Sequence, residues 1–492
     1  MNKDKIRSET MKRNLTMLAD FYEFTMSNAY LEIGKEDTIA IFDLYFRKVP
    51  DNGAFAIAAG LESAIDYIKN LNFSEEDLNY LRSKGKFSEK FLAYLKNMKF
   101  ECDIWAVPDG TVVFPNEPLI IVKGPIIQAQ ILETMLLICM NHQSLIATKA
   151  SRIVRSAQGK PVMEFGSRRA QGPDAANLGA KSAYLAGCIG TANALSDVDY
   201  KVPALGTMAH SWITMFDSEY EAFCAYAKTY PNDCTLLVDT YDTLKSGVPN
   251  AIRCFDDILK PMGIRPMGIR LDSGDMAYLS KVARRMLDES GYYDCQIVAS
   301  NSLDENRIQD LLVQGAKIDS FGVGENLITA KSNPVFGGVY KLVAIEKNGE
   351  IIPKIKISEN VEKITTPGLK FTYRIYDNKT NMAEADLTVL ADEEINEEEA
   401  LEIFHPIHTW KRKVFTNFTA KVIQKKIFEK GELIYDIPTL DESRQFCKRE
   451  VDSLWEEHKR LDNPHIYKVD LSEKLWNLKN NLIKEVREDT QK

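Results

Sequence analysis

Between residues 160 and 330 the chain alternates short apolar runs with amphipathic stretches of helical spacing. Each apolar run ends in a compact polar or glycine-bearing motif. The six motifs are EFGSRR (164–169), GTMAHS (206–211), DTYD (239–242), RLDSGD (270–275), SNS (300–302) and FGVGEN (321–326). This alternation predicts buried parallel strands linked by helices, and we interpret the region as an α/β barrel with fewer than eight strands. Active-site groups gather at the carboxyl ends of barrel strands, so chemistry is expected at these motifs.

The predicted strands are the apolar runs themselves. They are KPVMEF (160–165), VPALGTM (202–208), CTLLVD (234–239), MGIRL (267–271), CQIVAS (295–300) and IDSFGV (318–323). The segments between them have helical periodicity, and the segment DENRIQDLLVQG predicts a helix that ends at Gly315.

The flanking segments show other patterns. Residues 14–130 mix helices with strands rich in β-branched and aromatic residues, which is typical of an α+β layer. After residue 345, alternating strand-like segments precede a charged tail with helical periodicity. We therefore expect an N-terminal domain (1–130), the barrel with the active site (131–345), and a C-terminal α+β extension (346–492). This extension is expected to pack back on the first domain or on a partner subunit.

Composition narrows the class of protein. The 492 residues are 45% hydrophobic and 27% charged, as in ordinary globular proteins. The net charge is -9 and no lysine and arginine cluster stands clear of acidic neighbours, which argues against a nucleic-acid partner. A local basic pocket for a phosphorylated small molecule remains compatible with this charge.

The cysteines and the N-terminal residues predict where in the cell the protein is located. The eight cysteines are far apart, with no CxxC and no zinc-ligand spacing, so we expect buried, reduced thiols. The polar start MNKDKIRSETMKRN lacks the apolar centre of a signal peptide. No apolar stretch approaches the roughly 20 residues that span a bilayer. These features predict a cytoplasmic protein without a membrane segment.

Familiar nucleotide motifs are absent, because neither GxGxxG after a strand nor GxxxxGK[ST] occurs. The motif FGVGEN offers another way to hold phosphate, since backbone N–H groups at Gly322 and Gly324 can face an anion. A plain tight turn is the alternative. Ser300 and Asn301, in the SNS motif, are equally typical of a helix N-cap.

His210, in GTMAHS, has two possible roles. A lone histidine at a strand end is often a structural hydrogen-bond partner. However, small residues surround this one, and Asp239 closes the next strand, where its carboxylate would fix the tautomer and stabilise a cationic ring. In that arrangement His210 is a nucleophile or a general base.

Two further motifs combine cations with other groups. In RLDSGD, Arg270 suits a planar carboxylate or phosphate, while Asp272 and Asp275 suit Mg²⁺ or diol oxygens; a capped turn into the next helix is the alternative. In EFGSRR, Phe165 precedes two arginines, including Arg168. A ring beside guanidinium groups suits an anionic aromatic substrate, although a core ring and solvated arginines are also possible.

In their order, these motifs resemble a known family. The segments LADFYEFTM, EFGSRRAQGPDAA, GTMAHSW, DTYDT, GIRLDSGD, FGVGENL and NPVFGGVYKLV are similar to those of nicotinate phosphoribosyltransferases, over residues 14–345. The resemblance implies a type II phosphoribosyltransferase fold, with an N-terminal α/β sandwich, an irregular α/β barrel and a homodimer with shared active sites. The implied reaction joins nicotinate to 5-phosphoribosyl 1-diphosphate, coupled to ATP hydrolysis, and yields nicotinate mononucleotide and diphosphate for NAD synthesis.

The resemblance also implies roles for individual residues. Phe165 and Tyr22 would sandwich the nicotinate ring, Tyr22 from the partner subunit, while Arg270 and Thr207 meet its carboxylate. The ribose 5-phosphate end would be held by Arg168, Gly324, Ser300 and Asn301 with Thr329 nearby, and the ribose hydroxyls by Asp272. ATP would phosphorylate His210, and Asp239 would stabilise the charged ring. Mg²⁺ would be held mainly through the diphosphate, without an assigned protein ligand.

Three alternatives remain at this stage. Nicotinamide phosphoribosyltransferases generally carry Glu before the histidine, where this chain has Ala209. Quinolinate phosphoribosyltransferases share the fold but are shorter and lack the ATP-dependent histidine. A non-catalytic metabolite-binding relative is the third, although it has no need of a nucleophile such as His210. Residues 346–492 receive no chemical role, and His405 and His408, separated by a proline, are expected in a structural loop.

Overall fold

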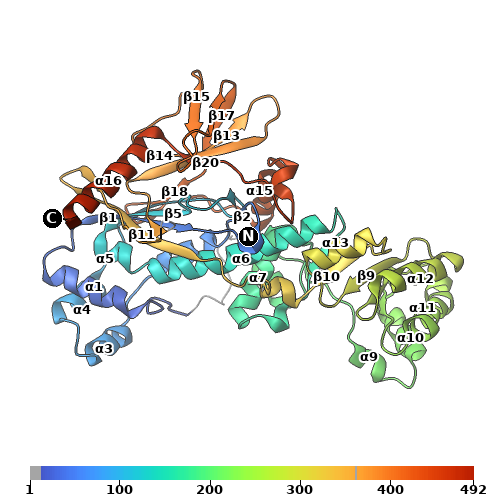
Figure 1. Ribbon diagram of the computed structural model, residues 1–492. Coiled ribbons are helices and arrows are strands. Elements are labelled where there is room, and N and C mark those ends of the chain that lie inside the picture. The colour runs from blue at the N-terminus through green and yellow to red at the C-terminus, as the bar shows by residue number, and fades with distance from the viewer. Residues whose placement is uncertain (1–12, 361–362, 492) are drawn as a thin grey trace. The chain divides into compact units, whose positions relative to one another are not determined.

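The computed structural model describes residues 13–360 and 363–491 (Figure 1). The chain forms two compact units, of which the first comprises residues 149–334. The second combines residues 13–148 with the described residues from 335 onward, and the long helix α6 (Glu133–Ser156) contains the boundary. The polar segment used to argue against a signal peptide falls largely on residues 1–12, outside the described residues.

The first unit is built on a parallel five-stranded sheet with the strand order β6-β10-β9-β8-β7. The strands are β6 (Val162–Glu164), β7 (Thr235–Leu237), β8 (Gly268–Leu271), β9 (Gln296–Ser300) and β10 (Ser320–Val323). Beyond β6, two parallel bridges continue the arrangement, one between Glu164 and Thr191 and one between Thr191 and Ala204. The carboxyl ends of all five strands therefore lie along one edge.

Helices alternate with these strands, and side-chain caps start several of them. Asp275 accepts from the backbone of Tyr278 at the start of α12, and Asp304 caps α13 in the same way. Gly315 follows α13 with a φ of 76°, as predicted for a helix end. The helices are α7 (Pro173–Leu185), α8 (Ala194–Tyr200), α9 (His210–Thr214), α10 (Glu219–Thr229), α11 (Val248–Cys254), α12 (Met276–Glu289), α13 (Glu305–Val313) and α14 (Glu325–Ile328).

The structure confirms the predicted alternation and corrects one strand. Five of the six apolar runs contain a parallel strand, but the run at 202–208 contributes only the bridge at Ala204. Pro203 lacks a backbone N–H and Gly206 weakens a strand, so a regular ladder does not form there. Among the described residues no strand pairing joins β7 to the Ala204 segment, and closure into a barrel stays a prediction.

The second unit contains an antiparallel seven-stranded sheet that draws on both ends of the chain. Its order is β12-β11-β1-β5-β3-β18-β19, so the late strand β18 pairs with the early strand β3. The strands are β1 (Ile39–Phe46), β3 (Asp103–Ala106), β5 (Ile120–Pro125), β11 (Gly338–Lys347), β12 (Glu350–Pro353), β18 (Lys425–Glu429) and β19 (Glu432–Leu433). The segment after residue 345 thus completes a sheet begun by the first 125 residues.

Smaller elements surround this sheet. Four strands form a second sheet in the order β17-β13-β14-β20. Two further two-stranded sheets pair β2 with β4 and β15 with β16. Their bounds are β2 (Ala56–Ile57), β4 (Val112–Val113), β13 (Lys370–Asp377), β14 (Ala383–Leu390), β15 (Leu401–Phe404), β16 (Arg412–Phe415), β17 (Phe418–Val422) and β20 (Val469–Leu471). The helices are α1 (Phe21–Glu32), α2 (Leu61–Lys69), α3 (Glu75–Ser83), α4 (Glu89–Asn97), α5 (Ile126–Gln130), α15 (Leu440–Asp452) and α16 (Glu473–Gln491).

Buried charges connect the late strands of the second unit to the early ones. Arg374 on β13 is fully buried and pairs with Asp386 at 2.7 Å and Glu450 at 2.6 Å. It also donates to the carbonyl of Val112 at 2.7 Å. Removing one partner of such a network leaves an uncompensated buried charge, so the network holds β13 against β4.

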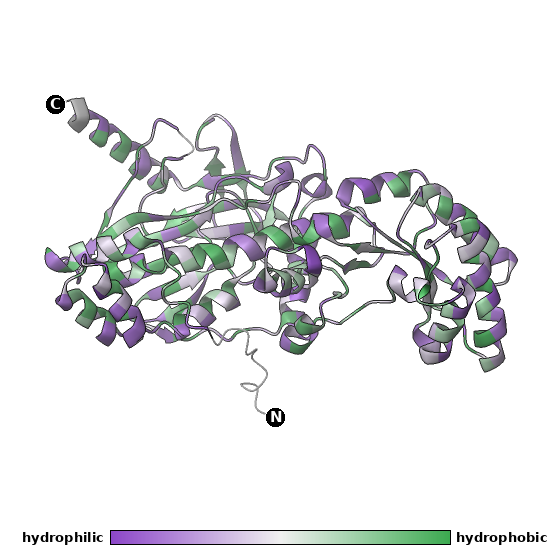
Figure 2. Cartoon of the chain, turned by 90° about the horizontal axis from the view of Figure 1, so that it is seen from below, coloured by the Kyte–Doolittle hydropathy of each residue, from purple (hydrophilic) through white to green (hydrophobic). Residues whose placement is uncertain are grey.

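Side-chain environments match the expected class. All eight cysteines are buried, and none of them forms a disulfide. Figure 2 shows hydrophobic residues along the strands and hydrophilic residues on helix surfaces. Within residues 13–360 and 363–491, no helix is long and apolar enough to cross a bilayer.

Candidate functional site

Three cavities lie at the carboxyl edge of the parallel sheet in the first unit. Their volumes are about 290, 450 and 240 Å³, and Arg168 and Arg270 line all three. Phe165 lines the first and third, and His210 and Thr207 line the second. Five of the six predicted motifs therefore contribute to a shared site. EFGSRR and RLDSGD line all three cavities, GTMAHS lines the first two, and SNS and FGVGEN line the third.

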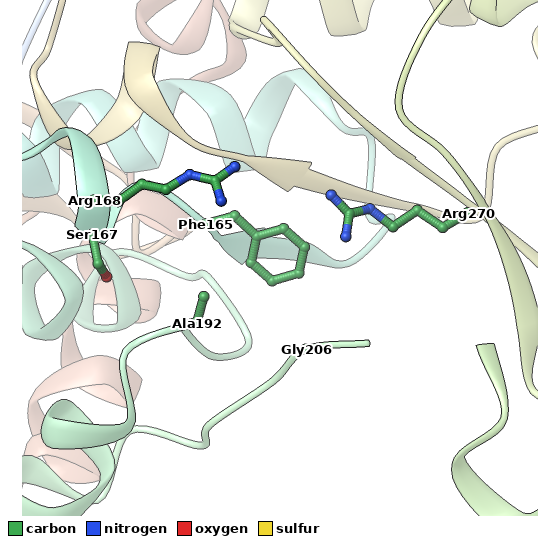
Figure 3. A pocket seen from close by; sticks show the side chains of 6 residues that line it. All are labelled: Phe165, Ser167, Arg168, Ala192, Gly206 and Arg270. Atoms are coloured by element: carbon green, nitrogen blue, oxygen red, sulfur yellow. The ribbon is translucent and has the colours of Figure 1, made fainter. Parts of the chain in front are cut away.

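An aromatic ring lies between two cations in the first cavity. Phe165 follows β6, and Arg168 belongs to the short turn η4 (Ser167–Arg169). Figure 3 shows the guanidinium groups of Arg168 and Arg270 pointing toward one another on either side of the Phe165 ring. The Arg270 guanidinium carbon lies 5.6 Å from the ring centroid. Among the described residues Arg168 has no hydrogen-bond or ion-pair partner, so its charge is available to an anion.

The ring of Phe165 occupies space that a glycine provides. A Cβ atom at Gly322, on the adjacent strand β10, would lie 2.5 Å from Cδ2 and 2.6 Å from Cε2 of Phe165. Ordinary carbon contacts begin near 3.5 Å. A side chain at position 322 is thus excluded by the ring, which explains this glycine without a phosphate.

Arg270 is held by a network across the tips of β8 and β9. Its Nε donates to Ser300 Oγ at 2.9 Å and its Nη2 to Asp272 Oδ1 at 3.0 Å. Ser300 in turn donates to the same carboxylate. The remaining Nη1 lies 3.5 Å from the carbonyl of Met208, a weak contact that a better acceptor can replace. The guanidinium is therefore fixed in orientation and keeps one edge toward the cavity.

His210 begins α9 and is 43% exposed at the second cavity. Its Nδ1 lies 3.1 Å from Thr240 Oγ1, and its Nε2 lies 3.7 Å from Asp272 Oδ2. The helix is anchored by Trp212, whose Nε1 donates to the carbonyl of Ala222 at 3.1 Å. The imidazole is thus oriented from one side and open to a reactant from the other.

Asp239 has a different partner from the one predicted. Its carboxylate accepts from the backbone N–H of Asp272 at 2.9 Å and from Ser273 Oγ at 2.6 Å. Because β7 and β8 are adjacent and parallel with Leu237 opposite Arg270, Asp239 lies level with Asp272 just beyond the strand ends. The ring contacts of His210 come from Thr240 and Asp272 instead. In this structure Asp239 orders the loop that carries Asp272.

The third cavity combines unusual backbone with two cations. Asn301 and Ser302 have positive φ values of 90° and 51°, and Gly324 precedes α14. Lys331 pairs with Glu325 at 2.7 Å beside this segment, and Arg169 approaches the same carboxylate at 3.7 Å. The cavity therefore combines a turn of positive φ with cationic side chains, a combination that suits a phosphate.

Three predicted residues, Asp239, Thr329 and Tyr22, do not line these cavities. Thr329 donates to the carbonyl of Glu325 at 2.8 Å, at the end of α14. Tyr22 is on α1 of the second unit, where it is 44% exposed. Thr207 does line the second cavity, and its Oγ1 is buried without a hydrogen-bond partner.

Sequence reasoning missed several residues of the site. Thr240 was inside the DTYD motif but received no role. Ser167 stands within EFGSRR, and its buried Oγ lacks a partner. Ala192 and Gly206 line the first cavity, and no chemical signal marks either residue.

Comparisons with known proteins agree along the whole chain. Residues 17–141 match the nicotinate phosphoribosyltransferase (NAPRTase) N-terminal domain, residues 161–378 the nicotinate phosphoribosyltransferase (NAPRTase) family, and residues 369–479 the nicotinate phosphoribosyltransferase C-terminal domain. The nicotinate phosphoribosyltransferase of Bacillus subtilis is 45% identical over 476 residues, covering 96% of each chain. That of Dictyostelium discoideum is 37% identical over 524 residues, covering 95% of this chain and 88% of its own.

Solved structures agree with the sequence relatives. The crystal structure of human nicotinic acid phosphoribosyltransferase superposes with a TM-score of 0.82 at 28% identity. The match covers 95% of this chain and 100% of the human chain. On these matches, the chain belongs to the nicotinate phosphoribosyltransferase family.

Proposed function

We propose that this chain joins nicotinate to 5-phosphoribosyl 1-diphosphate and releases nicotinate mononucleotide and diphosphate, in NAD synthesis. The activity is the one in the names of its relatives. One observation carries the proposal: the guanidinium groups of Arg168 and Arg270 face each other across the Phe165 ring. A flat, anionic heteroaromatic acid matches that arrangement, because the ring stacks while the carboxylate pairs with a cation.

Nicotinate selection follows from Arg270. Nicotinate would lie on Phe165 with its carboxylate toward Arg270 Nη1 and the unpartnered hydroxyl of Thr207. A neutral amide leaves the guanidinium without an anionic partner, so nicotinamide is expected to bind much more weakly. Tyr22 from a partner subunit would cover the opposite face of the ring, in a homodimer with shared active sites.

The phosphoribosyl group would lie across the strand tips. Asp272 Oδ2 would accept from the ribose hydroxyls, and Ser300, Asn301, Gly324 and Arg168 would hold the 5-phosphate, with Thr329 nearby. The nicotinate nitrogen attacks the anomeric carbon, and the bond to the diphosphate breaks. In the transition state, positive charge develops on the ribose and negative charge on the departing diphosphate. Groups that stabilise the diphosphate anion therefore lower this barrier.

Mg²⁺ is expected with the diphosphate. Among the described residues no group of three or more His, Cys, Asp or Glu is placed to hold a metal ion. Asp272 offers one carboxylate, and its Oδ1 is already bonded to Arg270 and Ser300. This set fits an ion that is bound mainly by substrate phosphates and water. When bound, Mg²⁺ neutralises charge on the diphosphate.

ATP would be used at His210. A ring nitrogen attacks the γ-phosphorus and ADP leaves, which gives a phosphoramidate that water later hydrolyses to inorganic phosphate. Thr240 orients the ring for this step, and Asp239 acts through the loop of Asp272. We propose that the phosphorylated enzyme binds its substrates more tightly and that hydrolysis favours product formation.

The finer architecture belongs to the same proposal. An irregular barrel would close the arc of parallel strands, and the early strands of the second unit would form the α/β sandwich. Eight buried cysteines without a disulfide fit a reducing cytoplasm.

Steady-state assays with purified protein test the function. Formation of nicotinate mononucleotide is measured with nicotinate or nicotinamide, and ADP release is followed in the same reactions. We expect activity with nicotinate, and loss of coupled ADP release in His210→Ala. Mass spectrometry after ATP treatment should find an acid-labile phosphate on His210. Preference for nicotinamide refutes the proposed substrate, and coupled ATP turnover in His210→Ala refutes the phosphohistidine.

A further inference from the structure

Glu164 is a buried carboxylate that the proposed reaction does not use. It is the last residue of β6, fully buried, and lies immediately before Phe165. Its Oε2 accepts from Thr191 Oγ1 at 2.6 Å, and its Oε1 accepts from the backbone N–H of Gly166. Burial raises the pKa of this carboxyl, and the two hydrogen bonds oppose that rise. A charged group in such a position needs both donors.

Thr191 connects Glu164 to two other walls of the first cavity. It forms parallel bridges with Glu164 on one side and Ala204 on the other. The backbone N–H of Ala192 donates to the Glu164 carbonyl at 2.8 Å, and that of Leu205 donates to the Thr191 carbonyl at 2.8 Å. Neither the segment at residues 191–192 nor the segment at residues 204–205 belongs to a regular strand, so a small number of hydrogen bonds hold both in place.

The cavity wall is made of the residues that follow these bonds. Phe165, Ser167 and Arg168 come directly after Glu164, Ala192 comes after Thr191, and Gly206 follows the segment bridged at Ala204. Five of the six residues that line this cavity thus belong to segments that meet at Glu164 and Thr191. The sixth, Arg270, is held separately by Ser300 and Asp272.

The turn after Glu164 is tightly packed. A Cβ atom at Gly166 would lie 2.6 Å from the carbonyl oxygen of Gly324 and 2.6 Å from a methyl group of Ile328. The turn has no room to shift toward α14. If a hydrogen bond of Glu164 is lost, the turn can therefore move only toward the cavity. Such a movement displaces Phe165 and Arg168, which line the cavity.

We propose that Glu164 is a positioning residue for nicotinate, which holds the Phe165–Arg168 turn and the 191–206 segments in register so that ring and cation meet the substrate. The inference rests on the proposed function and deepens it. Glu164 touches neither substrate nor reacting atoms. Its removal should affect nicotinate binding before it affects phosphoribosyl transfer.

Isosteric substitutions separate this role from packing. Glu164→Gln keeps the shape but removes the negative charge that both donors stabilise, and its amide nitrogen can only donate, so the Thr191 hydroxyl has to accept instead. Thr191→Val removes the hydroxyl that donates to Glu164, and Thr191→Ser keeps it. Glu305→Gln is the matched control, because Glu305 is another buried carboxylate of this unit and pairs with Lys149 and Arg152 away from the cavities.

KM for nicotinate, KM for 5-phosphoribosyl 1-diphosphate, kcat and the melting temperature are measured for every variant. Losing a hydrogen bond to a charged group predicts a roughly 10-fold or larger rise in KM for nicotinate in Glu164→Gln and Thr191→Val. The value of kcat should stay within about twofold. KM for 5-phosphoribosyl 1-diphosphate should rise less than KM for nicotinate, because Arg168 is only one of several groups proposed to hold the 5-phosphate. Thr191→Ser should resemble the wild type. The double variant should be no worse than either single one, because both break the same bond.

Glu305→Gln should lower the melting temperature without changing KM for nicotinate. The positioning role is overturned if Glu164→Gln and Thr191→Val lower only the melting temperature, or if both KM values and kcat change together as in a general loss of folded enzyme. An active wild type with unaffected Glu164 variants contradicts this inference alone. A wild type that makes no nicotinate mononucleotide overturns the proposed function and this inference with it.

Discussion

A methyl group at position 322 should weaken nicotinate binding, because it would displace the Phe165 ring on which nicotinate is proposed to stack. In Gly322→Ala the new Cβ would lie 2.5 Å from the Phe165 ring, about 1 Å closer than carbon atoms normally approach. The backbone of Gly322 does not have a positive φ, so alanine itself fits the strand. The conflict must be relieved by the ring, which is displaced toward the cavity and away from its place beside Arg270.

The size of the effect follows from the contacts at risk. Stacking of an aromatic substrate on Phe165 is worth about 0.5–1.5 kcal/mol, and the interaction of a ring with a guanidinium about 0.5–1 kcal/mol or more. Loss of both predicts a rise of roughly 5- to 50-fold in KM for nicotinate. Overpacking of the strand adds about 1–3 kcal/mol of lost stability.

Two other glycines provide controls. Gly206→Ala places its Cβ where no atom lies within 4 Å, so the melting temperature should not fall. Gly268→Ala places its Cβ 2.8 Å from the carbonyl oxygen of Gln296 at the amino end of β8, away from the cavities. It should lower the melting temperature without raising KM for nicotinate. If Gly322→Ala behaves like Gly268→Ala, the argument that the glycine makes room for a substrate-binding ring is wrong.

Three further predictions test other parts of the structure. Thr240→Val should slow formation of phosphorylated His210 roughly 10-fold in a rapid-quench assay, with Thr240→Ser near wild type; equal losses in both variants would contradict an orienting hydrogen bond. Arg374→Met should lower the free energy of unfolding by about 3–5 kcal/mol in urea titrations, whereas Arg265→Met, which breaks an exposed pair, should cost less than about 1 kcal/mol. Burial raises the pKa of Glu23 from 4.5 to about 7, so the folded protein binds a proton that the unfolded chain has already lost, and stability should fall as the pH rises from 4.5 to 7. Glu23→Gln should remove this pH dependence of the free energy of unfolding, measured by denaturation at several pH values. An unchanged pH dependence in the variant would refute the argument.

The sequence was informative wherever a local pattern determines the structure. Apolar runs ending in polar motifs marked five parallel strands, and parallel strands bring their tips to one edge. For that reason Phe165, Arg270, Ser300 and His210 were found together although up to 135 residues separate them.

Side-chain contacts between the carboxyl ends of neighbouring strands could not be predicted from local sequence patterns. Asp239 and Thr240 are consecutive, and which of them faces His210 depends on the register of β7 against β8. Gly322 was interpreted as a phosphate contact or a turn, since no sequence signal shows that Phe165 lies against it. The run at 202–208 was predicted as a strand, because hydrophobicity outweighed Pro203 in the interpretation.

The pairing of β18 with β3 has a consequence for synthesis of the chain. When β3 leaves the ribosome, one of its edges has no neighbour until β18 appears about 320 residues later. At typical elongation rates of about 5–20 residues per second, that interval lasts tens of seconds. The contiguous stretch from 149 to 334 can mature during the delay, while the early strands wait with hydrogen-bonding groups exposed. Fragments that stop before residue 425 should therefore be prone to aggregation, and the nascent protein is a natural client for a chaperone.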